Sequence, residues 1–166
     1  MATKVTRVSR VSRVTGAPVV ADPVVRRPPV VPAARDLLAT ARHDISEAMS
    51  TTVATERFAA AHLAALRTAA AVLAVRTRPA ATKRPRNVWS MLPQVAPELT
   101  EWAAFFAAGA SKRAAAEAGL SRAVTAREAD DLLRDVQTFL ALVETTLGLD
   151  HQPVIPHLAP LAHRAG

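Results

Sequence analysis

An arginine and a histidine that lie close together in the sequence form the first pair that could carry out a reaction. Arg57 and His62 are five residues apart. Such a pair can cleave RNA, because histidine serves as general acid or base and arginine stabilises the charged transition state. Five residues on a helix correspond to about 140° of rotation, so the two side chains diverge. His62 also falls on an apolar stripe between Phe58 and Leu66. We therefore interpret His62 as a core or dimer-interface histidine, with catalysis as the alternative.

A group of basic residues before Trp89, which we call the basic corner, could bind phosphate. It contains no acidic residue and consists of Arg76, Arg78, Lys83, Arg84 and Arg86. Guanidinium groups bind phosphate through paired hydrogen bonds, and Trp89 could stack on a nucleobase. The alternative is a solvated loop with Trp89 in the core. We favour the alternative, because a tryptophan at helical spacing usually packs.

Two further groups resemble metal sites. Asp130, Asp131 and Asp135 are spaced for one helix, where we expect Asp130 to pair with Arg134 and Asp131 with Arg127 across a solvated face. A second group recurs every six residues in the tail and consists of His151, His157 and His163. In a polyproline conformation these would lie about 19 Å apart per step, too far to share a metal. We predict no metal at either group.

Several classes of site are excluded by composition. The chain has no cysteine, which rules out disulfides, thiolate metal sites and thiol nucleophiles. It also has no phosphate-cradling glycine loop, zinc pattern, nucleophile elbow or dinucleotide fingerprint. We therefore expect no cofactor.

The elements that must position these residues are all predicted to be helices. Apolar periodicity places them at about 33–50, 55–78, 88–95, 97–117 and 126–147. Thr51 or Thr52 is expected to cap the second helix, and Thr125 with Glu128 forms a capping box for the last, which Gly148 should end. Expected inner positions of the fourth are Leu99, Trp102, Phe106 and Ala110. The predicted fold is an antiparallel bundle of four to five helices.

Charge divides the chain into a basic arm and a nearly neutral remainder. Residues 1–35 have seven Lys and Arg against Asp22, a net of +6, which leaves +1 for residues 36–166. Residues 1–32 repeat Val-Thr-Arg or Val-Ser-Arg and then become rich in Val and Pro, which is typical of disordered segments. We predict a disordered arm (1–32), a helical domain (33–150) and a Pro- and His-containing tail (151–166). An acidic partner would meet the arm first.

No membrane span or secretory signal is expected. The most apolar stretch, 58–75, is interrupted by His62 and Arg67, which favours a buried helix over a membrane span. No apolar segment of the signal-peptide type follows the basic start. A cytoplasmic location is therefore the default expectation.

Four segments carry a resemblance to a known family. They are ERFAAAHLAALR (56–67), VWSML (88–92), APELTEWAAFF (96–106) and TAREADDLLR (125–134). These resemble an actinobacterial-type branch of the HEPN (higher eukaryotes and prokaryotes nucleotide-binding) superfamily, over about residues 33–150. The resemblance implies a bundle of two helix pairs that is often dimeric. The superfamily mixes ribonucleases with non-catalytic members.

The resemblance also implies where a nuclease site would lie. Nuclease members place an Arg, a polar residue, three or more further residues and a His near a dimer cleft. Arg86 and Asn87 match the first half of this motif, but positions 91–93 are Met, Leu and Pro. The other match, Arg57 to His62, has Phe58 where a polar residue is usual.

We therefore predict a non-catalytic HEPN-like module that binds RNA, a nucleotide or a protein partner and forms a homodimer. The basic arm would add non-specific affinity for phosphate. One alternative is a metal-independent ribonuclease that uses His62 with Arg57 or Arg86. Another is a structural adaptor whose arm docks on an acidic protein.

Overall fold

The computed structural model describes residues 30–77 and 87–156. Residues 1–29, 78–86 and 157–166 lie outside the described residues, and with them nearly all of the predicted arm. The described part contains helices and no strand, which confirms the predicted all-α bundle. Its elements are α1 (Pro32–Ser50), α2 (Ala54–Arg76), α3 (Val88–Val95), the short 3-10 helix η1 (Pro97–Leu99), α4 (Thr100–Glu117) and α5 (Ala126–Leu147).

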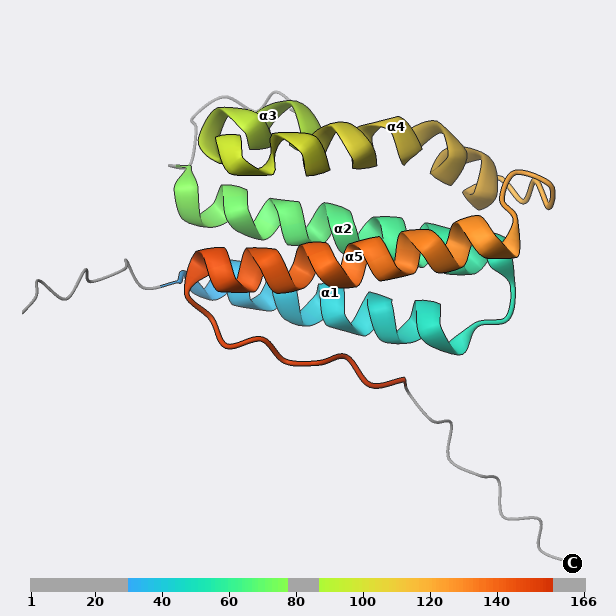
Figure 1. Ribbon diagram of the computed structural model, residues 1–166, viewed down its shortest axis with the longest axis horizontal. Coiled ribbons are helices and arrows are strands. Elements are labelled where there is room, and N and C mark those ends of the chain that lie inside the picture. The colour runs from blue at the N-terminus through green and yellow to red at the C-terminus, as the bar shows by residue number, and fades with distance from the viewer. Residues whose placement is uncertain (1–29, 78–86, 157–166) are drawn as a thin grey trace, which may run out of the picture.

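Helix α2 lies at the centre of the bundle. It contacts α1, α3, α4 and α5, with α1 and α4 on opposite sides of it (Figure 1). Many of its buried residues are alanines, including Ala61, Ala64, Ala65 and Ala69. Such small side chains let neighbouring helices approach closely and still fill the space between them. The alanine-rich composition is therefore what allows α2 to be enclosed on several sides.

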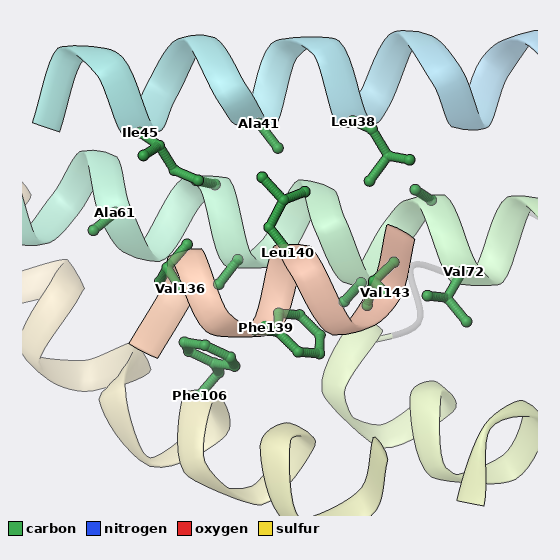
Figure 2. Packing of buried hydrophobic residues seen from close by; sticks show 14 of the residues in the cluster. Leu38, Ala41, Ile45, Ala61, Val72, Phe106, Val136, Phe139, Leu140 and Val143 are labelled. Atoms are coloured by element: carbon green, nitrogen blue, oxygen red, sulfur yellow. The ribbon is translucent and has the colours of Figure 1, made fainter. Parts of the chain in front are cut away.

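The central core joins α1, α2 and α5. Leu38, Ala41 and Ile45 project from α1 toward Val136 and Leu140 of α5 (Figure 2). On the other side of α5, Phe139 meets Phe106 of α4, with ring centroids 5.1 Å apart. The spacing of these residues gives each helix one apolar face, as the sequence predicted.

The last helix has the termini that the sequence predicts. The Thr125 hydroxyl accepts a hydrogen bond from the Glu128 amide at 3.2 Å, and Glu128 accepts one from the Thr125 amide at 2.8 Å. The predicted capping box is confirmed. Gly148 ends the helix with φ of +74°, a left-handed conformation in which glycine has no steric penalty.

The predicted cap of α2 is wrong. Val53 occupies the N-cap position without a side-chain hydrogen bond to the helix. The Thr51 hydroxyl instead accepts from the Val53 amide at 3.3 Å and donates to Glu56 at 2.8 Å. Thr51 is already the C-cap of α1, so its hydroxyl stabilises the turn between two helices. The other end of α2 also differs, since the helix stops at Arg76 and not at Arg78.

The inner face of α4 is rotated from the predicted one. Leu99 and Phe106 are buried and Trp102 is half-buried, but Ala110 is exposed. Pro97 begins a 3-10 turn, and the α-helix starts only at Thr100. Gly109 takes the place expected of Ala110 and lies against His62, where an added Cβ would be 3.2 Å from the ring. The absence of a side chain lets α4 approach α2 at this point.

Helix α2 is also the one helix in the described residues that is long and apolar enough to cross a membrane. Length and composition are weak evidence, because core helices of globular proteins pass the same test. Within the bundle, 56% of its apolar window is buried, and Arg67, which interrupts that window, forms an ion pair with Asp44 of α1. This placement agrees with the predicted buried helix.

Candidate functional site

A pocket of about 360 Å³ opens between α4 and α5 above the first half of α2. Its apolar floor is made by Phe58, Phe106 and Leu132, together with His62. Its outer edge combines an aromatic ring with charged groups, namely Phe105, Lys112, Glu128, Asp131 and Asp135. We refer to this site as the α4–α5 pocket. Phe105 is 45% exposed, so part of the apolar lining faces solvent.

The pocket exists because aromatic side chains hold α4 and α5 apart. Trp102 and Phe106 both contact Phe139, with ring centroids 5.4 and 5.1 Å apart. Further along the same pair of helices, Lys112 reaches Glu128 at 2.5 Å. Rings and long charged side chains span a wider gap than the alanines that face α1. The space between these two sets of contacts is the α4–α5 pocket.

His62 lies at the floor of the pocket and is 1% exposed. Its Nε2 donates a hydrogen bond to the Phe106 carbonyl at 2.8 Å. Its Nδ1 is therefore the unprotonated nitrogen, and it has no hydrogen-bond partner within the described residues. Burial lowers the pKa of His62, against an opposing effect of the hydrogen bond to Phe106. The ring is neutral at pH 7 and is a poor general acid.

Arg57 does not share a site with His62. Its guanidinium donates to the Thr51 carbonyl, at 2.6 Å from Nη2, and forms an ion pair with Asp130 of α5. The Arg–His pair considered from the sequence is thus separated, as the helical rotation predicts. The expected Asp130–Arg134 pair is wrong, because Arg57 is largely buried and takes Asp130 as its partner across the α2–α5 contact. Arg134 pairs with Asp131 at 2.8 Å.

The outer edge of the pocket carries more negative than positive charge. Glu128 accepts a hydrogen bond from Lys112. The pKa of Glu128 is lowered to about 2, mainly by this hydrogen bond. Asp131 is paired with Arg134 and, at 3.7 Å, with Arg127, as expected. Asp135 forms no ion pair in the described part of the chain. Its pKa is raised, first by burial and then by the neighbouring charge of Asp131.

The comparison with known protein families agrees with this fold. A family model described as SAV_6107-like HEPN matches residues 48–144, which is more than half of the chain. The chain belongs to this HEPN family. No curated protein and no solved structure matches it. The match confirms the resemblance to the HEPN superfamily, and it extends from the end of α1 through nearly all of α5.

Within the described residues, the basic corner differs from its prediction in one respect, the presence of an acidic residue, and agrees with the favoured interpretation that Trp89 lies in the core. Arg76 pairs with Glu98 of η1 at 2.6 Å, so an acidic residue does reach this corner. Trp89 is 5% exposed and stacks on Phe106 at 5.3 Å, which removes it as a base-stacking group. Asn87 caps α3 by accepting the Trp89 amide at 3.0 Å. The predicted members Arg78, Lys83, Arg84 and Arg86 lie outside the described residues.

The described part of the tail, residues 151–156, packs on the bundle. His151 Nδ1 lies 2.6 Å from Glu144, which is fully buried and also pairs with Arg42 of α1. Ser46 donates to the carbonyl of Ile155 at 3.2 Å. His157 and His163 lie outside the described residues. His151 therefore has a structural partner, and no group of three His, Asp or Glu in the described residues is placed to hold a metal ion.

Sequence reasoning missed the α4–α5 pocket as a unit. Asp131 and Asp135 were expected on a solvated face, and they lie half-exposed at the pocket's edge. Phe105 and Lys112 were not singled out, and Leu132 was expected only as part of the apolar face of the last helix. The one signal available was Gly109, a glycine in the middle of an alanine-rich helix, since such a position usually marks a close approach of another group.

Proposed function

We propose that this HEPN domain is a binding module that takes a cationic and partly apolar group, such as an arginine side chain of a protein partner, into the α4–α5 pocket. The observation that carries the proposal is the combination of aromatic floor and carboxylate edge at one opening. Carboxylates pair with a guanidinium, and aromatic rings favour a cation over their faces and pack against its aliphatic stem.

The charge of the pocket argues against a phosphate ligand there. Three carboxylates, Glu128, Asp131 and Asp135, line it against the ammonium of Lys112. A phosphate would meet like charge at this edge. Of the partner classes predicted from the sequence, RNA, a nucleotide or a protein, the pocket supports a protein partner best.

The carboxylates of the pocket suit a cation. Asp135 has a raised pKa, first because it is partly buried and then because of the charge of Asp131. A positive charge placed near both carboxylates would relieve their repulsion.

The test is a titration of the ¹⁵N-labelled full chain with acetyl-arginine amide, followed by NMR. Amide signals of Ala108, Gly109 and Lys112 are expected to shift. The matched control ligand is acetyl-citrulline amide, which has nearly the same shape without the charge. The double variant Asp131→Asn/Asp135→Asn is expected to weaken binding of the arginine ligand about tenfold, equivalent to about 1.4 kcal/mol.

Two results would contradict the proposal. Equal binding of the citrulline ligand would show that charge is not recognised. Shifts of the same amides by single-stranded RNA, added in EDTA to a separate sample, would favour the nucleic-acid interpretation. Cleavage of that RNA which is lost in His62→Ala would favour the ribonuclease alternative.

A further inference from the structure

We infer that the α4–α5 pocket is occupied by the basic N-terminal segment of the same chain, through the arginines of its Val-Thr-Arg and Val-Ser-Arg triplets. This inference rests on the proposed function, because it names the group that the pocket receives. The triplets are residues 5–7, 8–10 and 11–13. Their arginines are Arg7, Arg10 and Arg13.

Charge complementarity is the first argument. Residues 1–29 contain six basic residues and Asp22, a net charge of +5. The charged groups that line the pocket are Lys112, Glu128, Asp131 and Asp135, a net of −2. Outside the lining, Arg134 and Arg127 pair with Asp131, so Asp135 is the lining carboxylate without an ion pair among the described residues. The rest of the chain from residue 30 is close to neutral. The most basic segment of the molecule therefore has a local acidic counterpart on the same molecule.

The composition of the triplets matches both parts of the pocket. Each arginine stands two residues after a valine, so a cationic and an apolar side chain recur together. Phe58, Phe105 and Leu132 offer apolar surface within the same opening as Asp131 and Asp135. A valine can contact the rings while the guanidinium of the same triplet reaches the carboxylates.

The length of chain between each arginine and the start of the bundle decides which arginines can reach the pocket. The segment joins the bundle at Val30, directly before α1. The residues that line the pocket come from the start of α2, the second half of α4 and the start of α5. Figure 1 shows these parts of the three helices at the opposite end of the bundle from the start of α1. Helix α1 has 19 residues and is therefore about 28 Å long. The 16 residues from 14 to 29 can span at most about 55 Å when extended.

The triplets can therefore cover this distance with chain to spare. Arg26 and Arg27 are only four and three residues before Val30, which gives them a reach of about 10–14 Å. They cannot reach the pocket and are natural control residues.

Because the segment is covalently attached to the bundle, even a pocket with weak affinity can hold it. A linker of 16 residues holds the triplets at an effective concentration of roughly millimolar. An arginine site with millimolar affinity would then be filled about half of the time, and three equivalent triplets raise that fraction. A partner that offers an arginine must compete with the segment, so the segment sets a threshold for partner binding.

Paramagnetic NMR on the full chain tests the inference. The chain contains no cysteine, so Ser9→Cys provides one attachment point for a nitroxide, beside Arg10. The amides of Ala108, Gly109 and Lys112 are expected to lose more than half of their intensity. Adding Arg7→Gln, Arg10→Gln and Arg13→Gln should restore them, whereas Arg26→Gln with Arg27→Gln should not.

Each other outcome overturns the inference. If the intensities at the pocket are undiminished, the segment does not dock in the pocket. If the losses persist without the triplet arginines, those arginines do not hold the segment in the pocket. Losses that also appear in nitroxide-free ¹⁵N-labelled chains mixed with nitroxide-bearing unlabelled chains mean that a second copy supplies the segment. Titration of the triplet variant with acetyl-arginine amide separates the two proposals. If the pocket of that variant binds the ligand, and the Ser9→Cys nitroxide chain that keeps its triplet arginines shows no broadening at the pocket, the inference is removed and the proposed function stands.

Discussion

At the residue scale, His62 is a packing residue that keeps an unused acceptor. Its ring lies between Phe58, Trp89 and Phe106, with centroid distances of 6.4, 5.9 and 6.2 Å. Because burial lowers its pKa, the folded protein holds the ring neutral where an unfolded chain would bind a proton. The residue that most resembles a catalytic group in the sequence thus contributes to the core.

This burial predicts a pH dependence of stability. The contribution of neutral His62 is fully present above the ordinary pKa of 6.5 and is lost as pH falls below it, because the unfolded state then binds the extra proton. We expect the free energy of unfolding in urea to fall less between pH 7.5 and pH 5.5 in His62→Gln than in the wild type. The exposed His43→Gln serves as control and should keep the wild-type dependence. Equal losses in all three proteins would contradict this account.

Glu144 is a second buried charge whose partners come from other parts of the chain. It is 0% exposed and is paired with Arg42 of α1 and His151 of the tail. Removing one member of such a group is costly, because the charge that remains is left without its partner. The three residues together attach the first part of the tail to α1 and α5.

We expect Glu144→Gln to lower the free energy of unfolding by about 2–3 kcal/mol. This lies below the usual cost for a fully buried pair, because Arg42 and His151 both reach solvent and can be rehydrated. Chemical denaturation measures the change. Glu47→Gln, at an exposed position of α1, is the matched control and should stay within about 0.5 kcal/mol of the wild type. Similar stabilities of the two variants would show that the Glu144 contacts contribute little.

At the scale of elements, the bundle uses two kinds of helix contact. The contact of α2 with α1 is made largely through alanines and single aliphatic side chains such as Leu38 and Ile45. The contact of α4 with α5 is made through aromatic rings. The first brings helices close together and the second keeps them apart. The location of the α4–α5 pocket follows from this difference.

Gly109 lies where α4 packs against His62 of α2, and its replacement should be costly. Replacing a glycine inside a helix by alanine normally stabilises the protein by about 1 kcal/mol. Here the new Cβ would lie 3.2 Å from His62, whose ring is held by Phe106 and cannot easily move. We expect Gly109→Ala to destabilise the protein by about 1 kcal/mol in thermal unfolding. The exposed Ser111→Ala on the same helix should be neutral or slightly stabilising, and a gain in Gly109→Ala would show that the ring yields.

At the scale of the whole molecule, charge is divided between a basic segment and a nearly neutral domain with an acidic pocket. The net charge of +7 comes mainly from residues 1–35. Ion pairs inside the bundle, such as Arg57–Asp130 and Arg67–Asp44, use up most of the domain's own charges. The half-exposed carboxylates at the pocket are then a counterpart for the N-terminal arginines.

This division predicts that the overall size of the molecule depends on salt. The distance over which exposed charges attract each other falls from about 10 Å at 0.1 M salt to a few ångström near 1 M, because dissolved ions screen them. The radius of gyration of the full chain, measured by small-angle scattering, should therefore increase between 0.05 and 0.5 M salt (about 14 and 4 Å of screening length). The triplet variant should be large at both concentrations. An unchanged radius in the wild type would contradict docking of the segment.

The sequence by itself determined the helices of this protein. Apolar periodicity placed all five, the capping box of Thr125 and the glycine at 148 fixed the ends of α5, and the positions of His62 and Trp89 on apolar stripes indicated that both are buried. These features follow from the chain within a few turns of helix. The family could also be recognised from short segments, because they lie in the helices that form the core.

Only the tertiary structure decided the partners of the charged residues and the existence of the pocket. Arg57 pairs with Asp130 and Arg76 with Glu98, although local spacing suggested Arg134 for Asp130 and no acid near Arg76. The choice of Gly109 over Ala110 as an inner position also depended on where α4 meets His62. Helical periodicity fixes the face on which a residue lies, but the distance and rotation between helices depend on how all the side chains of the core pack together.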